Sequence, residues 1–277
     1  MIYKKGALNI DGFNINYLAR KFNTPIYCYS SIKIKENILN FKKKFKKINP
    51  LICFAVKANA NIKILNEIKK FGFGADVVSI GELMKALKAG INPKKIVFSG
   101  VGKTDNELEY AINKKILLIN TESKNEILEI EKIAKRKKKI VNIGIRLNPN
   151  TDAKTISQIS TGKKENKFGV NEKIFLQLVS YVRKSKNLNL KCLSVHIGSQ
   201  ILSYKPYQKM LAAVDRTIKK SNYKFEYIDL GGGMGIDYSH NNTKLNLQKY
   251  SKSIEKFIKN NNSKIIFEPG RSIIGSA

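Results

Sequence analysis

LICFAVKANANIKILNEIKKFGFGADVVS, residues 51–79, carries two short apolar runs separated by a lysine-rich segment. The runs at 51–56 and 74–79 are rich in apolar and β-branched residues, as buried strands are. The segment between them mixes apolar and charged residues in the way that is typical of an amphipathic helix. This stretch therefore predicts a strand, a helix and a second strand, which is the unit from which parallel sheets are built.

The same alternation recurs through the rest of the chain, with a new apolar run roughly every 25 residues. Eight runs follow this rhythm, at residues 51–56, 74–79, 96–100, 116–120, 140–148, 190–199, 225–233 and 264–270. Eight parallel strands with intervening helices predict a closed (β/α)₈ barrel of the TIM type. A doubly wound open sheet has the same period and remains the alternative.

Three segments depart from this rhythm. Residues 25–30, PIYCYS, look like one more strand, and a basic helix is expected between them and residue 50. Residues 149–170 are polar and contain glycine, which predicts a long loop after the fifth strand; in a barrel that loop would lie on the catalytic face. Thr104 is expected to cap the helix that follows it.

The net charge of +31 is the strongest signal in the composition and could indicate a nucleic-acid partner. Lysine supplies nearly all of it, whereas arginine, whose planar fork recognises phosphates and bases, occurs only six times. Abundant isoleucine and asparagine point instead to a compositional bias of the coding sequence. We therefore expect no specific nucleic-acid partner, and at most a weak, salt-sensitive attraction to anions.

The cysteines, histidines and apolar stretches argue against a disulfide-rich, metal-binding or membrane-spanning protein. Cys28, Cys53 and Cys192 are widely spaced and form no CxxC motif, so they predict neither a disulfide framework nor a zinc ribbon. His196 and His240 form no HExxH motif, and no metal site is expected. The longest apolar runs fall far short of the roughly 20 residues of a membrane span. We expect a cytoplasmic protein with no membrane partner.

Two nucleotide-binding patterns are incomplete. VFSGVGKT (97–104) ends like a P-loop, but Val97 stands where the first glycine is required. GGGMGI (231–236) places Ile236 where the last glycine of GxGxxG would stand. Neither pattern supports ATP or NAD as a cofactor.

Charged or titratable residues, and residues suited to binding a phosphate, gather where the predicted strands end. They are Lys57, Asp76, Arg146, His196, Ser199, Gly231, Gly232, Gly233, Glu268 and Arg271. Each has an ordinary structural explanation on its own, such as a solvent-reaching lysine, a hydrogen-bonded histidine or a tight glycine turn. Together they supply an amine for a Schiff base, a glycine-rich phosphate site and an acid able to keep a ring nitrogen protonated. Those are the parts that a pyridoxal phosphate site requires.

Six motifs carry a resemblance to a known family. They are FAVKAN (54–59), GADVVSIGEL (74–83), KFGV (167–170), HIGSQ (196–200), DLGGGMGI (229–236) and EPGR (268–271). In this order and spacing, the chain resembles the fold-type III pyridoxal-phosphate-dependent decarboxylases over nearly its whole length. HIGSQ is more similar to the diaminopimelate decarboxylase branch than to the ornithine and arginine branch.

The resemblance implies roles for the motif residues. Lys57 would bind pyridoxal 5'-phosphate as a Schiff base, His196 would stack on its ring, and Glu268 would pair with the ring nitrogen; these are the expected catalytic residues. Arg271 would contact the substrate. The other implied cofactor contacts are Ser199, Gly231, Gly232, Gly233, Pro269, Gly270 and Arg271 around the phosphate, and Asp76, Arg146 and Glu82 in support of the ring.

The implied function is decarboxylation of meso-diaminopimelate to L-lysine, the last step of lysine biosynthesis, by a homodimer when the chain is full length. In this family a carboxy-terminal β domain follows EPGR and supplies substrate contacts and a proton-donating cysteine, whereas this chain stops six residues after Arg271. We therefore expect a cofactor-binding barrel over 31–277, an extension over 1–30 that joins the β domain, and a fragment with little activity of its own.

Two related functions stay open on the sequence. A single-domain barrel of the same fold type, which carries pyridoxal phosphate without turnover, would share the cofactor motifs but has no need of a substrate arginine at position 271. A decarboxylase for a related basic amino acid would differ in contacts that this chain does not contain.

Overall fold

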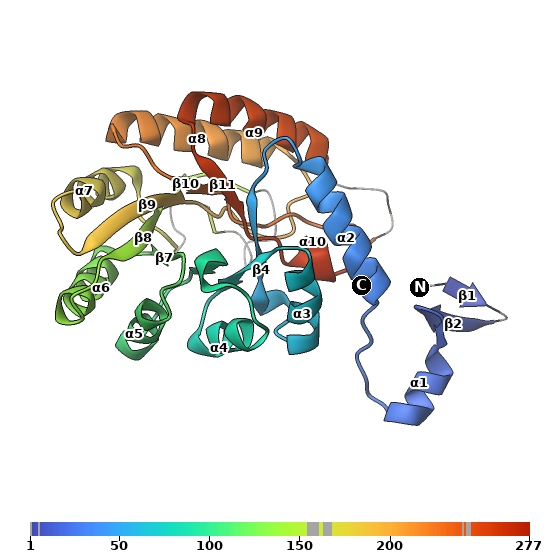
Figure 1. The fold of residues 1–277 in the computed structure, drawn as a ribbon. Coiled ribbons are helices and arrows are strands. Elements are labelled where there is room, and N and C mark those ends of the chain that lie inside the picture. Colours follow the sequence, from blue (N-terminus) through green and yellow to red (C-terminus); the bar gives the residue numbers. More distant parts are fainter. Residues whose placement is uncertain (1, 5, 154–160, 163–167, 240, 242–244) are drawn as a thin grey trace.

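The computed structural model describes residues 2–4, 6–153, 161–162, 168–239, 241 and 245–277. Eight parallel strands close into a barrel in the order β10-β11-β4-β5-β6-β7-β8-β9, with helices around it (Figure 1). The strands are β4 (Leu51–Ala55), β5 (Gly74–Val77), β6 (Ile96–Phe98), β7 (Leu118–Thr121), β8 (Val141–Arg146), β9 (Leu188–Ser194), β10 (Tyr227–Asp229) and β11 (Lys264–Phe267). The predicted barrel is confirmed, and the open sheet is excluded.

Helices of varied length connect these strands. They are α2 (Ser31–Lys44), α3 (Ile62–Lys70), α4 (Ile80–Lys88), α5 (Asp105–Asn113), α6 (Lys124–Arg136), α7 (Glu172–Val182), α8 (Lys205–Ser221), α9 (Leu247–Asn261) and α10 (Arg271–Ile274), with short 3₁₀ turns η1 (Val56–Ala58) and η2 (Pro93–Lys95). The predicted runs 190–199 and 225–233 extend past β9 and β10. Their last residues leave the sheet and form part of the rim where the strands end, called here the carboxyl rim.

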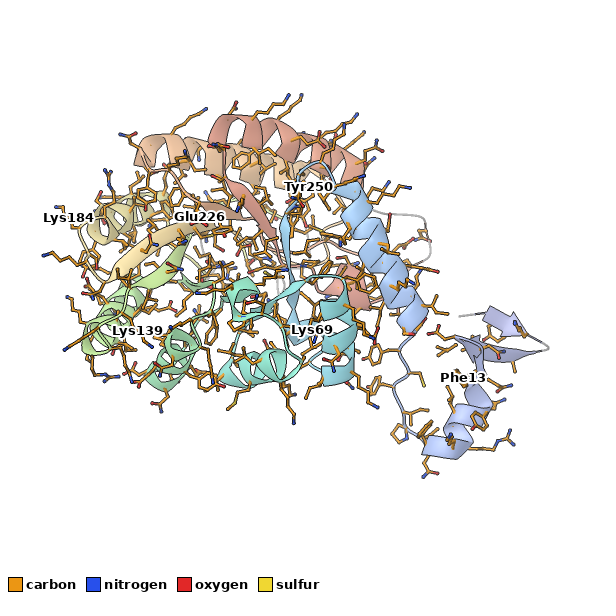
Figure 2. All side chains as sticks on the ribbon, in the orientation of Figure 1. Phe13, Lys69, Lys139, Lys184, Glu226 and Tyr250 are labelled. Carbon is orange, nitrogen blue, oxygen red and sulfur yellow. The ribbon has the colours of Figure 1, made fainter. Side chains whose placement is uncertain are left out.

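The chain before α2 forms a small unit beside the barrel (Figure 1). β1 (Ile2–Lys4), β2 (Ala7–Ile10) and β3 (Phe13–Asn14) make an antiparallel sheet, and α1 (Ile15–Phe22) follows. No residue of α1 is buried, and Phe13 is exposed on this unit (Figure 2). The Asp11 carboxylate accepts hydrogen bonds from Ser30, Ser31 and the N–H of Ile32, which ties the unit to the start of α2.

The strand predicted at residues 25–30 is wrong. These residues pair with no described strand and form an irregular connection between α1 and α2. Tyr27 is 92% exposed, so the apolar side chains of this segment have no sheet to pack on. The composition of PIYCYS imitates a strand, but β propensity acts only where a neighbouring strand supplies contacts and burial.

Aromatic residues fill the space between α2 and the barrel. Phe41 and Phe45 on α2 pack against Phe267, with ring centroids 5.7 Å and 4.6 Å from it. Tyr250 of α9, marked in Figure 2, packs against Phe45 and stacks on Tyr207 of α8 at 4.2 Å. This cluster ties α2, α8 and α9 to the strand that ends immediately before Glu268.

Three successive helices begin with the same cap at the carboxyl rim. A serine or threonine before α4, α5 and α6 accepts a hydrogen bond from the N–H of the glutamate three residues later; the pairs are Ser79–Glu82, Thr104–Glu107 and Ser123–Glu126. The predicted cap at Thr104 is confirmed, and Glu107 completes a capping box with it. These caps fix the turns that lead from the strand ends into the helices.

Lys103 braces two of these turns through a buried ion pair. Its ammonium group donates to the Glu126 carboxylate at 2.6 Å and to the carbonyl groups of Gly100 and Asn120 at 2.6 Å and 2.9 Å. The other oxygen of Glu126 accepts from the N–H of Glu122 at 2.7 Å. Only 1% of the Lys103 side chain is exposed, so the pair is shielded from solvent.

We expect Lys103→Ala to lower the free energy of unfolding by about 3–5 kcal/mol, because it leaves the Glu126 carboxylate buried without its cation. Urea unfolding at neutral pH measures the change. The control, Lys132→Ala, breaks the exposed Lys132–Glu129 pair and is expected to cost less than about 1 kcal/mol. Equal stability of the two variants would contradict the bracing role.

Candidate active site

Lys57 lies in η1, immediately after β4, and its ammonium group is 2.9 Å from the Asp76 carboxylate on the neighbouring strand β5. The Asp76 side chain is fully buried, whereas half of the Lys57 side chain is exposed. Burial alone would lower the pKa of Lys57, but the charge and the hydrogen bond of Asp76 raise it above its usual value. The ion pair therefore holds a charged amine at the mouth of the barrel.

Glu268 follows β11, the other neighbour of β4. Its carboxyl group accepts a hydrogen bond from the Ser99 hydroxyl at 3.2 Å. Burial, together with the charges of Asp229 and Asp76, raises the pKa of Glu268 well above its usual value. Two adjacent strands thus bring together a lysine ammonium group paired with a carboxylate and a carboxyl group whose pKa is raised well above its usual value.

His196 lies after β9, against the glycine loop that follows β10. Its Nδ1 accepts a hydrogen bond from the N–H of Gly232 at 3.2 Å, so Nε2 is the protonated nitrogen of the neutral ring. Burial and the charges of Arg146 and Lys57 hold the pKa of His196 well below its usual value. Gly231 has φ +64°, and a Cβ there would lie 2.5 Å from Nδ1, so this close approach requires glycine.

Ser199, Gly233, Gly270 and Arg271 line one end of a cavity of about 380 Å³ that also contacts Lys57, His196 and Glu268. The Arg271 guanidinium donates to the Tyr238 hydroxyl at 2.6 Å and to Ser199 at 3.4 Å. Its Nε is buried and has no hydrogen-bond partner among the described residues. This end of the cavity therefore presents hydroxyl groups, glycine backbone and a cation with a free donor, which suits an anion.

A second cavity, of about 360 Å³, adjoins the first through Lys57, His196 and Glu268. Arg146 lines it and donates to the Glu122 carboxylate at 2.7 Å, while Phe168 packs on the guanidinium at 4.9 Å. Phe168 and Thr161 belong to the segment predicted as a long loop over the catalytic face. The described parts of that segment do line the site, and residues 154–160 and 163–167 lie outside the described residues.

The structure brings most of the sequence-predicted site residues to these two cavities. Those that do not line a cavity, apart from Glu82, contact residues that do. Asp76 lies below Lys57, Gly231 accepts from the Glu268 N–H at 2.8 Å, and the Pro269 carbonyl accepts from the Ala55 N–H at 3.2 Å. Glu82 is farther away, where it accepts from the N–H of Val78 at the start of α4.

Sequence reasoning missed three side chains that complete the walls. Tyr238 and Glu122 hold the two arginines, and Phe168 covers one of them. Glu122 comes directly after a strand, β7, just as Glu268 comes directly after β11, and that pattern could have revealed it. Tyr238 lies in no strand or helix, and nothing in its neighbourhood signals an arginine partner.

Comparison with known proteins identifies the family. The model described as "Pyridoxal-dependent decarboxylase, pyridoxal binding domain" matches residues 31–275. The chain belongs to this family. Among curated relatives, the diaminopimelate decarboxylase of Helicobacter pylori strain J99 is 43% identical over 96% of the chain, and that of Aquifex aeolicus is 40% identical over 99%. The chain spans 66% of the length of each relative.

Solved structures agree with this assignment to the pyridoxal-dependent decarboxylases. Diaminopimelate decarboxylase from Helicobacter pylori, complexed with L-lysine, superposes with a TM-score of 0.90 at 43% identity, covering 94% of this chain and 66% of that one. The corresponding enzyme from M. jannaschi gives 0.91 at 33% identity, covering all of this chain and 67% of that one.

The cofactor of this family is pyridoxal 5'-phosphate, and the residues at the cavities fit it. An amine, a carboxyl group with a raised pKa and an anion-binding end face the same space, which has the size of a small-molecule site. The unpartnered Nε of Arg271 and the Ser199 hydroxyl supply donors for a phosphate. Position 233 requires glycine, because a Cβ there would lie 2.2 Å from the Gly198 carbonyl oxygen.

Two further features are absent from the described residues. They contain no group of three or more His, Cys, Asp or Glu side chains able to hold a metal ion. No helix among them is long and apolar enough to cross a bilayer.

The neutral state of buried His196 predicts a pH-dependent stability. Because the histidine of the unfolded chain binds a proton below its usual pKa of 6.5 and the folded one does not, stability falls as pH drops below 6.5, by up to about 1.4 kcal/mol per pH unit. His196→Asn retains an acceptor for the Gly232 N–H and should lose this contribution. Urea unfolding between pH 7.5 and 5 compares the slopes, and identical slopes would refute a neutral His196.

Proposed function

We propose that this protein decarboxylates meso-diaminopimelate to L-lysine with pyridoxal 5'-phosphate as its cofactor. The observation that carries the proposal is the convergence of Lys57, His196 and Glu268 with the anion-binding end at Arg271 on one cavity. The relatives named above support the substrate, since they are diaminopimelate decarboxylases and one was solved with L-lysine.

In this proposal each group of residues around the cavity has a defined role. Lys57 holds the cofactor covalently through its amine, and His196 packs its neutral ring against the cofactor ring. Ser199, Gly233, Gly270 and Arg271 bind the phosphate from the segments that follow β9, β10 and β11; Gly231 and Gly232 shape the second of these segments and Pro269 the third. Asp76 keeps Lys57 in place, and Arg146 supports the far side of the ring.

Glu268 is assigned to the ring nitrogen. The cofactor, when bound, supplies an electron sink for the charge that remains after CO₂ leaves. Glu268 at the nitrogen would keep that nitrogen protonated, and a protonated nitrogen lets the ring accept the developing charge, so the contribution of Glu268 is larger in the transition state than in the ground state. Burial next to Asp229 makes Glu268 a proton carrier well above the usual pH range of a carboxyl group.

We further propose that residues 1–30 join another domain rather than the barrel. The exposure of α1 and of Phe13 and Tyr27 supports this, because such apolar surface usually marks an interaction site. The family model likewise matches only from residue 31. Homodimerisation and a cytoplasmic location stay predictions from the sequence.

Covalent attachment at Lys57 is tested directly. The chain is incubated with pyridoxal phosphate, reduced with borohydride and mapped by peptide mass spectrometry. We expect the label on Lys57 in near-stoichiometric amount, because its amine opens into both cavities. Lys57→Ala should lose the label and the visible absorption band, whereas Lys132→Ala, at an exposed surface lysine, should keep both. Label scattered over surface lysines would refute the site.

The role of Glu268 is tested by introducing Glu268→Ala into this chain extended to the full length of its relatives. The assay follows the release of L-lysine from meso-diaminopimelate. We expect kcat to fall by at least about 100-fold, since the missing contact acts mainly in the transition state. The affinity for pyridoxal phosphate, titrated by absorbance, should change by less than tenfold. Equal losses of kcat and of cofactor affinity would show a general binding role instead. Cofactor binding with no lysine release by the wild-type chain extended to the full length of its relatives would favour the carrier alternative.

A further inference from the structure

A layer of buried polar side chains lies beneath Glu268 inside the barrel, and the proposed function leaves it unexplained. Ser99, Asn120, Ser194 and Asp229 come from four different strand ends, and all four are buried. Polar groups in a barrel interior are costly unless they are hydrogen-bonded, so this layer calls for a specific explanation.

Asp229 is the centre of the layer. It accepts from the Gly231 N–H at 2.9 Å, from Asn120 Nδ2 at 2.8 Å and from the Ser194 hydroxyl at 3.4 Å. Three donors directed at one carboxyl group stabilise its ionised form. Glu268, by contrast, accepts from a single donor, the Ser99 hydroxyl, on Oε1.

The carboxyl groups of Asp229 and Glu268 are also linked by a relay: the Asn120 amide donates to Asp229 and to the Ser99 hydroxyl, and that hydroxyl donates to Glu268. Two ionised carboxylates buried in one such layer repel each other, and the charge of Asp229 raises the pKa of Glu268, so a single proton between them lowers the cost of burial. The donors around Asp229 favour its charged form. The proton therefore lies on Glu268, on the oxygen that Ser99 does not contact.

We propose that Asp229 is a positioning residue that retains a proton on Glu268 and aims the Glu268 carboxyl group at the cofactor ring nitrogen. Asn120 supports this arrangement, because its Nδ2 donates both to Asp229 and, at 3.2 Å, to the Ser99 hydroxyl that binds Glu268. The network thus connects Asp229 to Glu268 through Asn120 and Ser99.

The other charges around the pair leave its single proton in place. Lys57 is paired with Asp76, and Arg146 with Glu122, so these four groups largely cancel. His196 is held neutral by burial and by the nearby cations, which lower its pKa. Burial raises the pKa of both Asp229 and Glu268, and that of Glu268 the more strongly.

The consequence for catalysis rests on the proposed function. A ring nitrogen that arrives without a proton would take the one on Glu268, with the O–H bond breaking and an N–H bond forming. Glu268 becomes a carboxylate as the ring becomes a cation, so the net charge of the site is unchanged. Asp229 remains ionised throughout and stabilises the cation.

Infrared spectroscopy of the cofactor-free chain tests the inference. A protonated carboxyl group gives a C=O band that a carboxylate lacks, and we expect this band at neutral pH in the wild type and its loss in Glu268→Gln. In Asp229→Asn the midpoint pH at which the band disappears should fall by at least about one unit, a tenfold change in proton affinity. If Asp229→Asn does not fold, Asp229→Ser removes the same charge and retains a hydroxyl group.

Ser99→Ala is the matched control. It removes the donor to Oε1 but leaves Asp229 intact, so the band should persist at neutral pH and move to higher frequency. Absence of the band in the wild type, or an unchanged midpoint on removal of the Asp229 carboxylate, would overturn the inference. Because these spectra are recorded without cofactor, they are independent of the proposed function, whose failure would appear separately as missing label on Lys57.

Discussion

Closure of the parallel barrel is the constraint on which the site depends, because it brings the carboxyl ends of all eight strands to a single rim. Lys57 follows β4 and Glu268 follows β11, strands that pair directly although more than two hundred residues separate them in sequence. The bond from the Ala55 N–H to the Pro269 carbonyl extends that pairing beyond the strands. The glycine loop after β10 then brings backbone N–H groups against His196, which no side chain larger than hydrogen would allow at Gly231.

Burial makes charge compensation the second requirement. A carboxylate inside a barrel costs several kcal/mol unless it is paired, hydrogen-bonded or protonated. Each acid here takes a different solution: Asp76 pairs with Lys57, Asp229 accepts hydrogen bonds from three donors, and Glu268 has a raised pKa, which favours its protonated form. Acids of the same kind are thus given different charge states by their surroundings, as catalytic sites with separate acid and base functions require.

The sequence predicts the framework well because the framework is local. An apolar run in the sequence predicts a buried strand without reference to the rest of the chain. A charged or titratable residue at the end of such a run is then conspicuous, and Lys57, His196 and Glu268 are singled out in this way. PIYCYS shows the limit of that reasoning, since an apolar run becomes a strand only beside a partner. The layer beneath Glu268 shows another: Asn120 and Asp229 are 109 residues apart, and no local pattern links an asparagine in one strand to an aspartate in another.

Many of the lysines lie at the ends of helices, away from the candidate active site. Helices run antiparallel to the strands they cover, so their carboxyl ends lie at the rim opposite the site. Lysines occupy the last turns of α2, α3, α6 and α8, where they complement the helix dipoles. Within the site the cations are few and each is committed, Lys57 to Asp76, Arg146 to Glu122 and Arg271 to Tyr238 and Ser199. The charge that dominates the composition is therefore largely peripheral, and among the described cations of the site it is Arg271 whose Nε has no hydrogen-bond partner.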